Sequence, residues 1–142
     1  MNLDYKKAIL LDLKKAFDTV NREELKNQIK IFSQNEVITE KLLLLIVDLY
    51  DKINYNICEN IIEPNRGIPQ GSVFGPLLFI IYINNMLLEA KNECPNTIAE
   101  AFIDDIIILG KDINSLQKAY RFFKSRIKGL KMELNVNKCE LL

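Results

Sequence analysis

The chain has 142 residues, of which 49% are hydrophobic and 27% are charged, a composition typical of one globular domain with a real core. It contains no histidine, which excludes catalysis by a histidine base or by a Ser-His or Cys-His pair. Its three cysteines, Cys58, Cys94 and Cys139, form no close pair in the sequence, so neither a disulfide framework nor a zinc site is expected.

The formal net charge is zero, which argues against a protein that holds nucleic acid by bulk charge alone. The distribution is uneven, because eight bases and only two acids lie between Lys111 and Lys138. The simplest interpretation of this stripe is a solvated helix face. The longest apolar runs, residues 42–47 and 77–83, are too short to span a membrane, and no signal peptide is evident. We therefore expect a soluble intracellular protein, cytoplasmic or nuclear, with no membrane partner.

The N-terminal third predicts a strand and two helices. Residues 8–13 form a short apolar run typical of a buried strand. Asn21 and Glu24 form a capping-box variant, which predicts a helix that continues to about Gln34. A second helix is expected over residues 39–51, with Thr39 as its N-cap.

The middle third predicts a hairpin, a loop and a central helix. Residues 53–58 alternate apolar and polar side chains, and the chain is expected to return as a strand at residues 61–62. Residues 65–72 contain two glycines and a proline without periodicity, which indicates a loop. The helix expected over residues 75–90 is apolar nearly all round, so we expect it in the middle of the domain.

The C-terminal third predicts a second hairpin, from residues 97–103 and 106–110, and an amphipathic helix from about Asp112. A final turn and strand are expected over residues 133–142. This order of elements predicts an α+β fold of the split βαβ, ferredoxin-like kind, in which helices pack on one face of a small antiparallel sheet.

Two adjacent carboxylates, Asp104 and Asp105, lie between the two apolar strands of that second hairpin. Carboxylates held together at a hairpin tip repel each other unless a positive charge lies between them, and a divalent metal ion would supply it. Asp12 has similar apolar surroundings and could complete an oxygen-rich site for Mg²⁺ if the strands are neighbours. Two Mg²⁺ ions about 3.5–4 Å apart are the usual means of activating a hydroxyl and stabilising a leaving phosphate.

Four segments together carry a family resemblance: residues 11–20 (LDLKKAFDTV), 67–79 (GIPQGSVFGPLLF), 102–105 (FIDD) and 129–139 (GLKMELNVNKC). In order and spacing they resemble successive palm motifs of reverse transcriptases. Gln-Gly-Ser followed by Gly-Pro-Leu-Leu-Phe is most similar to the enzymes of non-LTR, LINE-type retrotransposons. The resemblance implies an RNA-directed DNA polymerase that adds dNTPs to a primer 3′-hydroxyl on an RNA template.

The resemblance also implies roles for individual residues. Those assigned to metal binding are Asp12, Asp104, Asp105 and the backbone carbonyl of Leu13, with two Mg²⁺ ions for which Mn²⁺ could substitute. Phe17 matches the aromatic residue that excludes a ribose 2′-hydroxyl. Lys138 matches a lysine that protonates or neutralises the leaving pyrophosphate. The residues assigned to nucleotide, template or primer binding are Gln70, Gly71, Arg66 and Phe102.

Two departures from the family pattern are evident. Phe102 occupies a position at which the family usually has tyrosine, so the ring is kept and one polar contact is lost. The chain begins just before the first palm motif and ends soon after the last. Residues 1–142 are therefore expected to be a partial palm domain, whose fingers and thumb belong to a larger polyprotein or parent enzyme, and we expect the isolated chain to be inactive.

The sequence also permits two other interpretations of the function. A metal-dependent nucleotidyl cyclase also uses two carboxylates on a central hairpin, although the Pro-Gln-Gly loop and Phe17 speak against it. An inactive palm could instead serve as an RNA-binding or assembly module that uses the basic stripe from Lys111 to Lys138.

Overall fold

The computed structural model describes residues 5–51, 55–57, 60–62, 66–69 and 71–142. Its helices and strands follow the predicted order, with one additional short helix, α1. The elements are β1 (Lys7–Leu11), α1 (Ala16–Thr19), α2 (Arg22–Phe32), α3 (Glu36–Ile46), a π-helical segment (Val47–Asp51), β2 (Tyr55–Ile57), β3 (Asn60–Ile62), α4 (Gly75–Glu93), β4 (Thr97–Phe102), β5 (Asp105–Gly110), α5 (Ile113–Gly129), a 3₁₀ turn (Val136–Lys138) and β6 (Glu140–Leu141).

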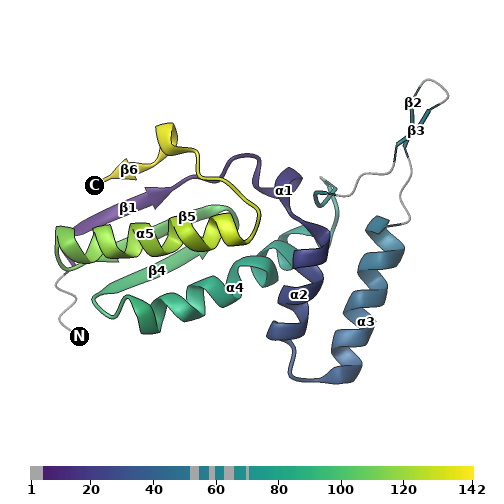
Figure 1. The fold of residues 1–142 in the computed structure, drawn as a ribbon, viewed down its shortest axis with the longest axis horizontal. Coiled ribbons are helices and arrows are strands. Elements are labelled where there is room, and N and C mark those ends of the chain that lie inside the picture. Colours follow the sequence, from purple (N-terminus) through teal and green to yellow (C-terminus); the bar gives the residue numbers. More distant parts are fainter. Residues whose placement is uncertain (1–4, 52–54, 58–59, 63–65, 70) are drawn as a thin grey trace.

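The main sheet has the strand order β4-β5-β1-β6, and all of its neighbours are antiparallel. Helices α4 and α5 lie side by side on one face of this sheet, while α2 and α3 extend to one end of it (Figure 1). Strands β2 and β3 form a separate two-stranded antiparallel sheet. The predicted α+β class, a small antiparallel sheet with helices on one face, is confirmed.

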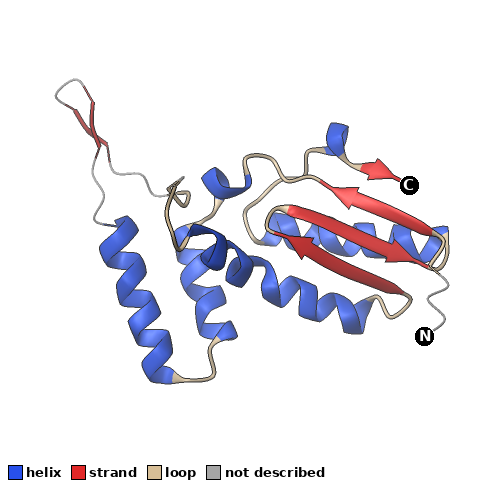
Figure 2. Cartoon of the chain, turned by 180° about the vertical axis from the view of Figure 1, so that it is seen from behind, coloured by secondary structure: helices blue, strands red, loops and turns tan. Residues whose placement is uncertain are grey.

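Side chains along each strand point alternately to the two faces of the sheet, and their burial explains why helices cover only one face. Leu11, Ile106 and Ile108 are at most 2% exposed, because they point toward the helices and form the core with them. Residues on the alternate positions of the same strands, such as Leu10 and Ile107, are half-buried. Viewed from behind, the strands lie in front of the two helices with nothing over them (Figure 2).

Local capping explains where the first helices begin. The Asn21 side chain accepts a hydrogen bond from the Glu24 backbone N–H at 2.9 Å, so the predicted cap of α2 is confirmed. The predicted cap of α3, Thr39, is wrong. Asn35 caps this helix by accepting from the Ile38 N–H at 3.1 Å, and the Thr39 hydroxyl donates to the Asn35 carbonyl from inside the first turn.

Helix α4 is less central than its composition predicts. Eight of its residues are buried, but Leu77, Ile80 and Leu88 are each about half exposed. The helix contacts α2, α5 and β4, and these neighbours cover only part of its circumference. No helix in the described part of the chain is both long and apolar enough to cross a membrane.

Helix α5 is amphipathic, as predicted. Its buried residues recur at helical spacing and are Leu116, Ala119, Phe123 and Ile127. Asp112 caps the helix by accepting from the Ser115 N–H at 2.8 Å and from the Ser115 hydroxyl at 3.0 Å. These hydrogen bonds lower the pKa of the Asp112 carboxyl, since they stabilise its charged form.

Candidate active site

The acid pair lies at a hairpin tip, as predicted. Phe102 and Asp105 are the last paired residues of β4 and β5, and Ile103 and Asp104 form the two-residue connection. Ile103 has a φ of 58°, a left-handed conformation that is unfavourable for a β-branched residue. Short hairpins of this kind require a positive φ in the turn, so the tight connection holds Ile103 in that conformation.

Asp12 follows directly after the last β1 residue paired with this hairpin, because Leu11 is the partner of Ile106. The chain is also held on its other side. The Asp12 carbonyl accepts from the Asn135 N–H at 2.8 Å, and the Lys14 N–H donates to the Glu133 carbonyl at 2.9 Å. Backbone pairing on both sides therefore fixes the segment that carries Asp12 next to the tip that carries Asp104.

A cavity of about 700 Å³ opens at this end of the sheet, and we call it the Asp12 cleft. It brings together five of the residues singled out from sequence: Asp12, Leu13, Arg66, Asp104 and Lys138. Its remaining lining residues are Lys14, Lys15, Ala16, Thr19, Lys131, Glu133 and Asn135.

The charges in the Asp12 cleft are predominantly positive. Its five bases are Lys14, Lys15, Arg66, Lys131 and Lys138, against three acids, Asp12, Asp104 and Glu133. One base and one acid are paired, since Lys14 Nζ lies 3.2 Å from Glu133 Oε2. An excess of cations around two half-buried carboxylates suits a polyphosphate substrate that carries a metal ion.

Sequence reasoning missed several residues of this cleft. Lys14 and Lys15 directly follow Asp12 and could have been found from that adjacency. The place of Lys131 and Asn135 in the cleft could not be found in this way, because it depends on the backbone pairing of residues 12–14 with residues 133–135.

The other predicted site residues that the structure describes are not part of the lining of the cleft. Asp105 is exposed, and Phe102 is 79% exposed at the hairpin tip. The half-buried ring of Phe17 packs on Phe79, with 5.0 Å between ring centroids. Gly71 is exposed with a φ of 84°, and Gln70 lies outside the described residues.

The donor chemistry of the cleft fits a hard divalent cation, although the described residues do not group three acidic or cysteine side chains closely enough to hold a metal ion by themselves. Two acidic residues, Asp12 and Asp104, line one cavity together with Leu13. Mg²⁺ commonly takes one or two protein carboxylates and completes its coordination with water and substrate phosphates. A two-carboxylate site is therefore compatible with this ion.

A buried arginine anchors the glycine-proline loop beside the cleft. Arg22 is 5% exposed, and its guanidinium donates to the Gly67 carbonyl at 3.2 Å and to the Tyr50 carbonyl at 2.6 Å. The Gly67 N–H donates to the Val20 carbonyl at 2.8 Å, and the Ile68 N–H donates to the Phe17 carbonyl at 2.9 Å. The loop is thus bonded to the chain that follows Asp12, and sequence reasoning did not single out Arg22.

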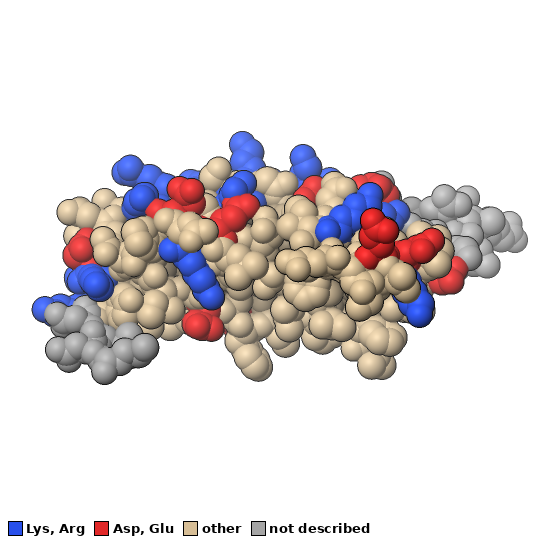
Figure 3. Space-filling model, turned by 90° about the horizontal axis from the view of Figure 1, so that it is seen from below, with Lys and Arg blue, Asp and Glu red and all other residues tan. Residues whose placement is uncertain are grey.

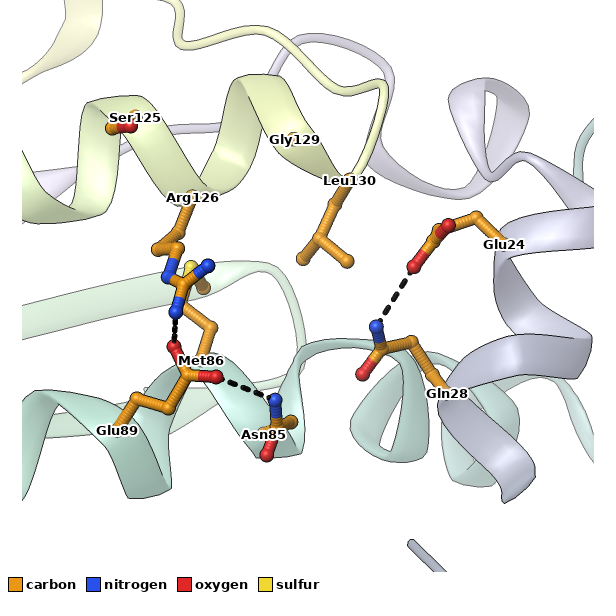
Figure 4. Close-up of a pocket in the computed structure, with 9 residues that line it drawn as sticks. All are labelled: Glu24, Gln28, Asn85, Met86, Glu89, Ser125, Arg126, Gly129 and Leu130. Carbon is orange, nitrogen blue, oxygen red and sulfur yellow. Dashed lines mark hydrogen bonds and ion pairs between the residues drawn. The ribbon is translucent and has the colours of Figure 1, made fainter. Parts of the chain in front are cut away.

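A second cavity, of about 310 Å³, lies between α2, α4 and α5 and contains none of the predicted residues (Figure 4). Its polar side chains satisfy one another. Gln28 donates to Glu24 at 2.8 Å, Asn85 donates to Glu89 at 2.8 Å, and Arg126 forms an ion pair with Glu89. Of these three interactions, the ion pair between Arg126 and Glu89 joins two helices and helps to hold α5 against α4.

An antiparallel sheet with helices on one face, and with acids from a strand end and a hairpin tip beside a basic cleft, has the architecture of the palm of a template-directed polymerase. The sequence comparison defines the family. Residues 2–142 match the model of the family described as reverse transcriptase (RNA-dependent DNA polymerase). The chain belongs to this family, so the family predicted from its motifs is confirmed.

The relatives are proteins of retroelements. The chain is 30% identical over 145 residues to the retrovirus-related Pol polyprotein from the type-1 retrotransposable element R2 of Popillia japonica, covering 93% of this chain and 23% of that protein. It is 27% identical over 74 residues to an intracisternal A-particle Pol-related polyprotein of mouse intracisternal A-particle MIA14, covering 52% of this chain and 8% of that protein. The chain thus spans about a quarter or less of the length of these relatives.

Solved structures show the same fold. The structure of apo telomerase from Candida tropicalis superposes with a TM-score of 0.76 at 14% sequence identity, covering 96% of this chain and 28% of that chain. A second structure of that telomerase, truncated from its C-terminal domain, gives a TM-score of 0.62. At this level of identity the likeness concerns the fold alone.

Proposed function

We propose that residues 1–142 are the palm, in partial form, of an RNA-directed DNA polymerase of a non-LTR-like retroelement, which transfers dNTPs to a primer 3′-hydroxyl on an RNA template. The observation that carries this proposal is the meeting of Asp12 and Asp104, 92 positions apart in the sequence, in one cleft whose other charged residues are mainly basic. Fingers and thumb of the parent polyprotein would complete the grip on template and primer.

Individual residues of the chain would have separate roles in this reaction. Asp12 and Asp104, with the Leu13 carbonyl, would hold two Mg²⁺ ions, or Mn²⁺ in their place. When bound, these ions supply activation of the primer hydroxyl and neutralisation of the developing phosphate charge. Asp105 would be the less direct ligand, a role supported by its position outside the lining of the cleft.

The basic residues of the cleft would bind the triphosphate. Lys138 and Arg66 line the same cavity as the acids, which supports a role for both in binding the phosphates. Lys138 would neutralise or protonate the leaving pyrophosphate, since an ammonium group can donate a proton as well as supply charge. Arg66 would contact the substrate, template or primer through a planar fork of N–H donors.

The remaining predicted residues would shape the nucleotide and primer sites. Phe17 would block the space of a ribose 2′-hydroxyl and so select dNTPs. Its ring is backed by Phe79 and cannot yield easily. Gln70 and Gly71 would line the nucleotide pocket, and Phe102, exposed at the tip beside Asp104, would support the primer end.

The decisive experiment replaces one carboxylate in the parent polypeptide that contains this chain. Asp104→Asn should abolish Mg²⁺-dependent dNTP incorporation on a primed RNA template, because an amide holds a divalent cation far less well than a carboxylate. Asp112→Asn is the matched control, since this residue caps α5 and an asparagine can also cap a helix. Equal incorporation by wild type and Asp104→Asn would contradict the proposal.

A second readout does not depend on activity. Mn²⁺ titrated into the 142-residue chain should broaden the NMR signals of residues 12–14 and 103–105, and Asp104→Asn should weaken this binding about tenfold or more. Broadening elsewhere in the chain, with none at these segments, would place the metal ion outside the Asp12 cleft.

A further inference from the structure

Helix α5 carries charges of one sign only. Between its ends it contains five bases, Lys118, Arg121, Lys124, Arg126 and Lys128, and no acid. The other long helices mix the two signs: α2 pairs Lys26 with Glu23 at 2.8 Å, for example. A solvated helix usually gains from such pairs at i,i+3 and i,i+4, whereas neighbouring like charges oppose helix formation. Lys118, Arg121 and Lys124 have this unfavourable spacing, and no acid of α5 offsets them, so this part of the helix would gain from an anionic partner.

Four of these bases lie on the exposed side of α5, because Leu116, Ala119, Phe123 and Ile127 hold its other side in the core. The exposed bases are Lys118, Arg121, Lys124 and Lys128. The fifth base, Arg126, forms an ion pair with Glu89 of α4. At 1.5 Å per residue, the row from Lys118 to Lys128 is about 15 Å long, which is long enough to contact more than one phosphate of a nucleic-acid strand.

The row continues into the Asp12 cleft. Lys131 follows Lys128 by three residues, is exposed, and lines the cleft together with Lys15 and Lys138. In Figure 1, α5 ends beside the turn that joins β4 to β5. The view from below shows basic side chains, with acidic ones among them, along the upper edge, the side on which α5 lies, and few charges along the opposite edge (Figure 3).

We infer that the exposed face of α5 binds the phosphate backbone of a single-stranded RNA that extends out of the Asp12 cleft. The choice of RNA rests on the proposed function, whereas the requirement for a polyanion rests on the charges alone. Tyr120 adds a half-buried ring next to the row, with Lys124 Nζ 6.0 Å from its centroid. A lysine beside an aromatic ring is a combination that single-stranded nucleic acids use, since phosphate and base can be contacted together.

The test measures the affinity of the 142-residue chain for an unprimed, fluorescently labelled RNA of about 20 nucleotides by anisotropy, at several salt concentrations. Each phosphate contact contributes about 0.7 to the slope of log K against log salt, which corresponds to about fivefold in affinity at 0.1 M salt. Lys124→Gln combined with Lys128→Gln should therefore weaken binding about 25-fold and reduce the slope by about 1.4. The matched control, Lys30→Gln combined with Lys41→Gln, removes the same charge from exposed positions on α2 and α3 and should change affinity less than about twofold.

Equal losses in the two double variants, or no loss in either, would overturn the assignment to α5. Displacement of the RNA by an equal charge of polyglutamate would overturn the choice of RNA and indicate an acidic protein. The outcome is separable from the polymerase proposal, because Asp104→Asn should leave this affinity within about twofold while it abolishes incorporation.

Discussion

Replacement of Gly67 by alanine should destabilise the fold more than the same replacement at Gly71. Both glycines have nearly the same left-handed conformation, with φ of 85° and 84°, but their surroundings differ. A Cβ on Gly67 would lie 3.1 Å from the Asp18 carbonyl oxygen and 3.3 Å from the Asp18 Cα, whereas a Cβ on Gly71 would meet no atom of the described residues within 4 Å. The pair therefore separates backbone strain from steric crowding.

The expected losses in the free energy of unfolding follow from backbone strain and steric crowding. A left-handed conformation costs a residue with a Cβ about 1–2 kcal/mol, and alanine recovers about 0.4–1 kcal/mol by restricting the unfolded chain. Gly71→Ala should thus lower the free energy of unfolding by about 1 kcal/mol. At Gly67 the crowding atoms belong to the backbone and cannot rotate aside, which adds about 1–3 kcal/mol. Gly67→Ala should therefore cost about 2–4 kcal/mol.

The assay is urea unfolding of the chain followed by far-ultraviolet circular dichroism, with each variant fitted for its midpoint and slope. Gly67→Ala should lower the midpoint clearly more than Gly71→Ala without changing the slope. If the two variants are equally stable, then the contact of Gly67 with the backbone of Asp18 does not determine how the loop packs, and the reasoning is refuted.

Two further predictions concern Tyr82 and Phe17. Burial raises the pKa of Tyr82 from 10.0 to about 12, so the folded state favours the protonated phenol. The resulting contribution to the free energy of unfolding is fully present below pH 10. It is lost as the pH rises from 10 to 12, and the loss is about 2–3 kcal/mol. Tyr82→Phe should remove that pH-dependent part of the unfolding free energy, measured against wild type at pH 9 and pH 11.5, and an unchanged pH dependence would contradict the burial argument. Phe17→Val in the parent polypeptide should raise incorporation of ribonucleotides relative to dNTPs at least about tenfold, measured by primer extension with competing substrates, because the smaller side chain leaves room for a 2′-hydroxyl. Unchanged selectivity would show that another residue excludes the ribose.

Local patterns in the sequence were sufficient for most of the secondary structure. The caps at Asn21 and Asp112 and the apolar periodicity of α5 depend on residues within a few positions of one another, so the sequence specifies them directly. The error at Thr39 has a local cause as well, since Asn35 and Thr39 are both good caps one turn apart. The exposure of Leu77 and Ile80 on α4 depends on neighbours distant in the sequence, which composition does not reveal.

The sequence by itself determined the family and pointed to the candidate acids, because the motif residues and their spacing can be recognised without coordinates. Tertiary structure alone decided which of them meet. Antiparallel pairing of β1 with β5, and of residues 12–14 with residues 133–135, brings Asp12, Asp104, Lys131 and Lys138 to one cleft and leaves Asp105 outside its lining. The register of strand pairing and the reversals of the chain place residues about a hundred positions apart beside one cleft. No local pattern in the sequence encodes this proximity.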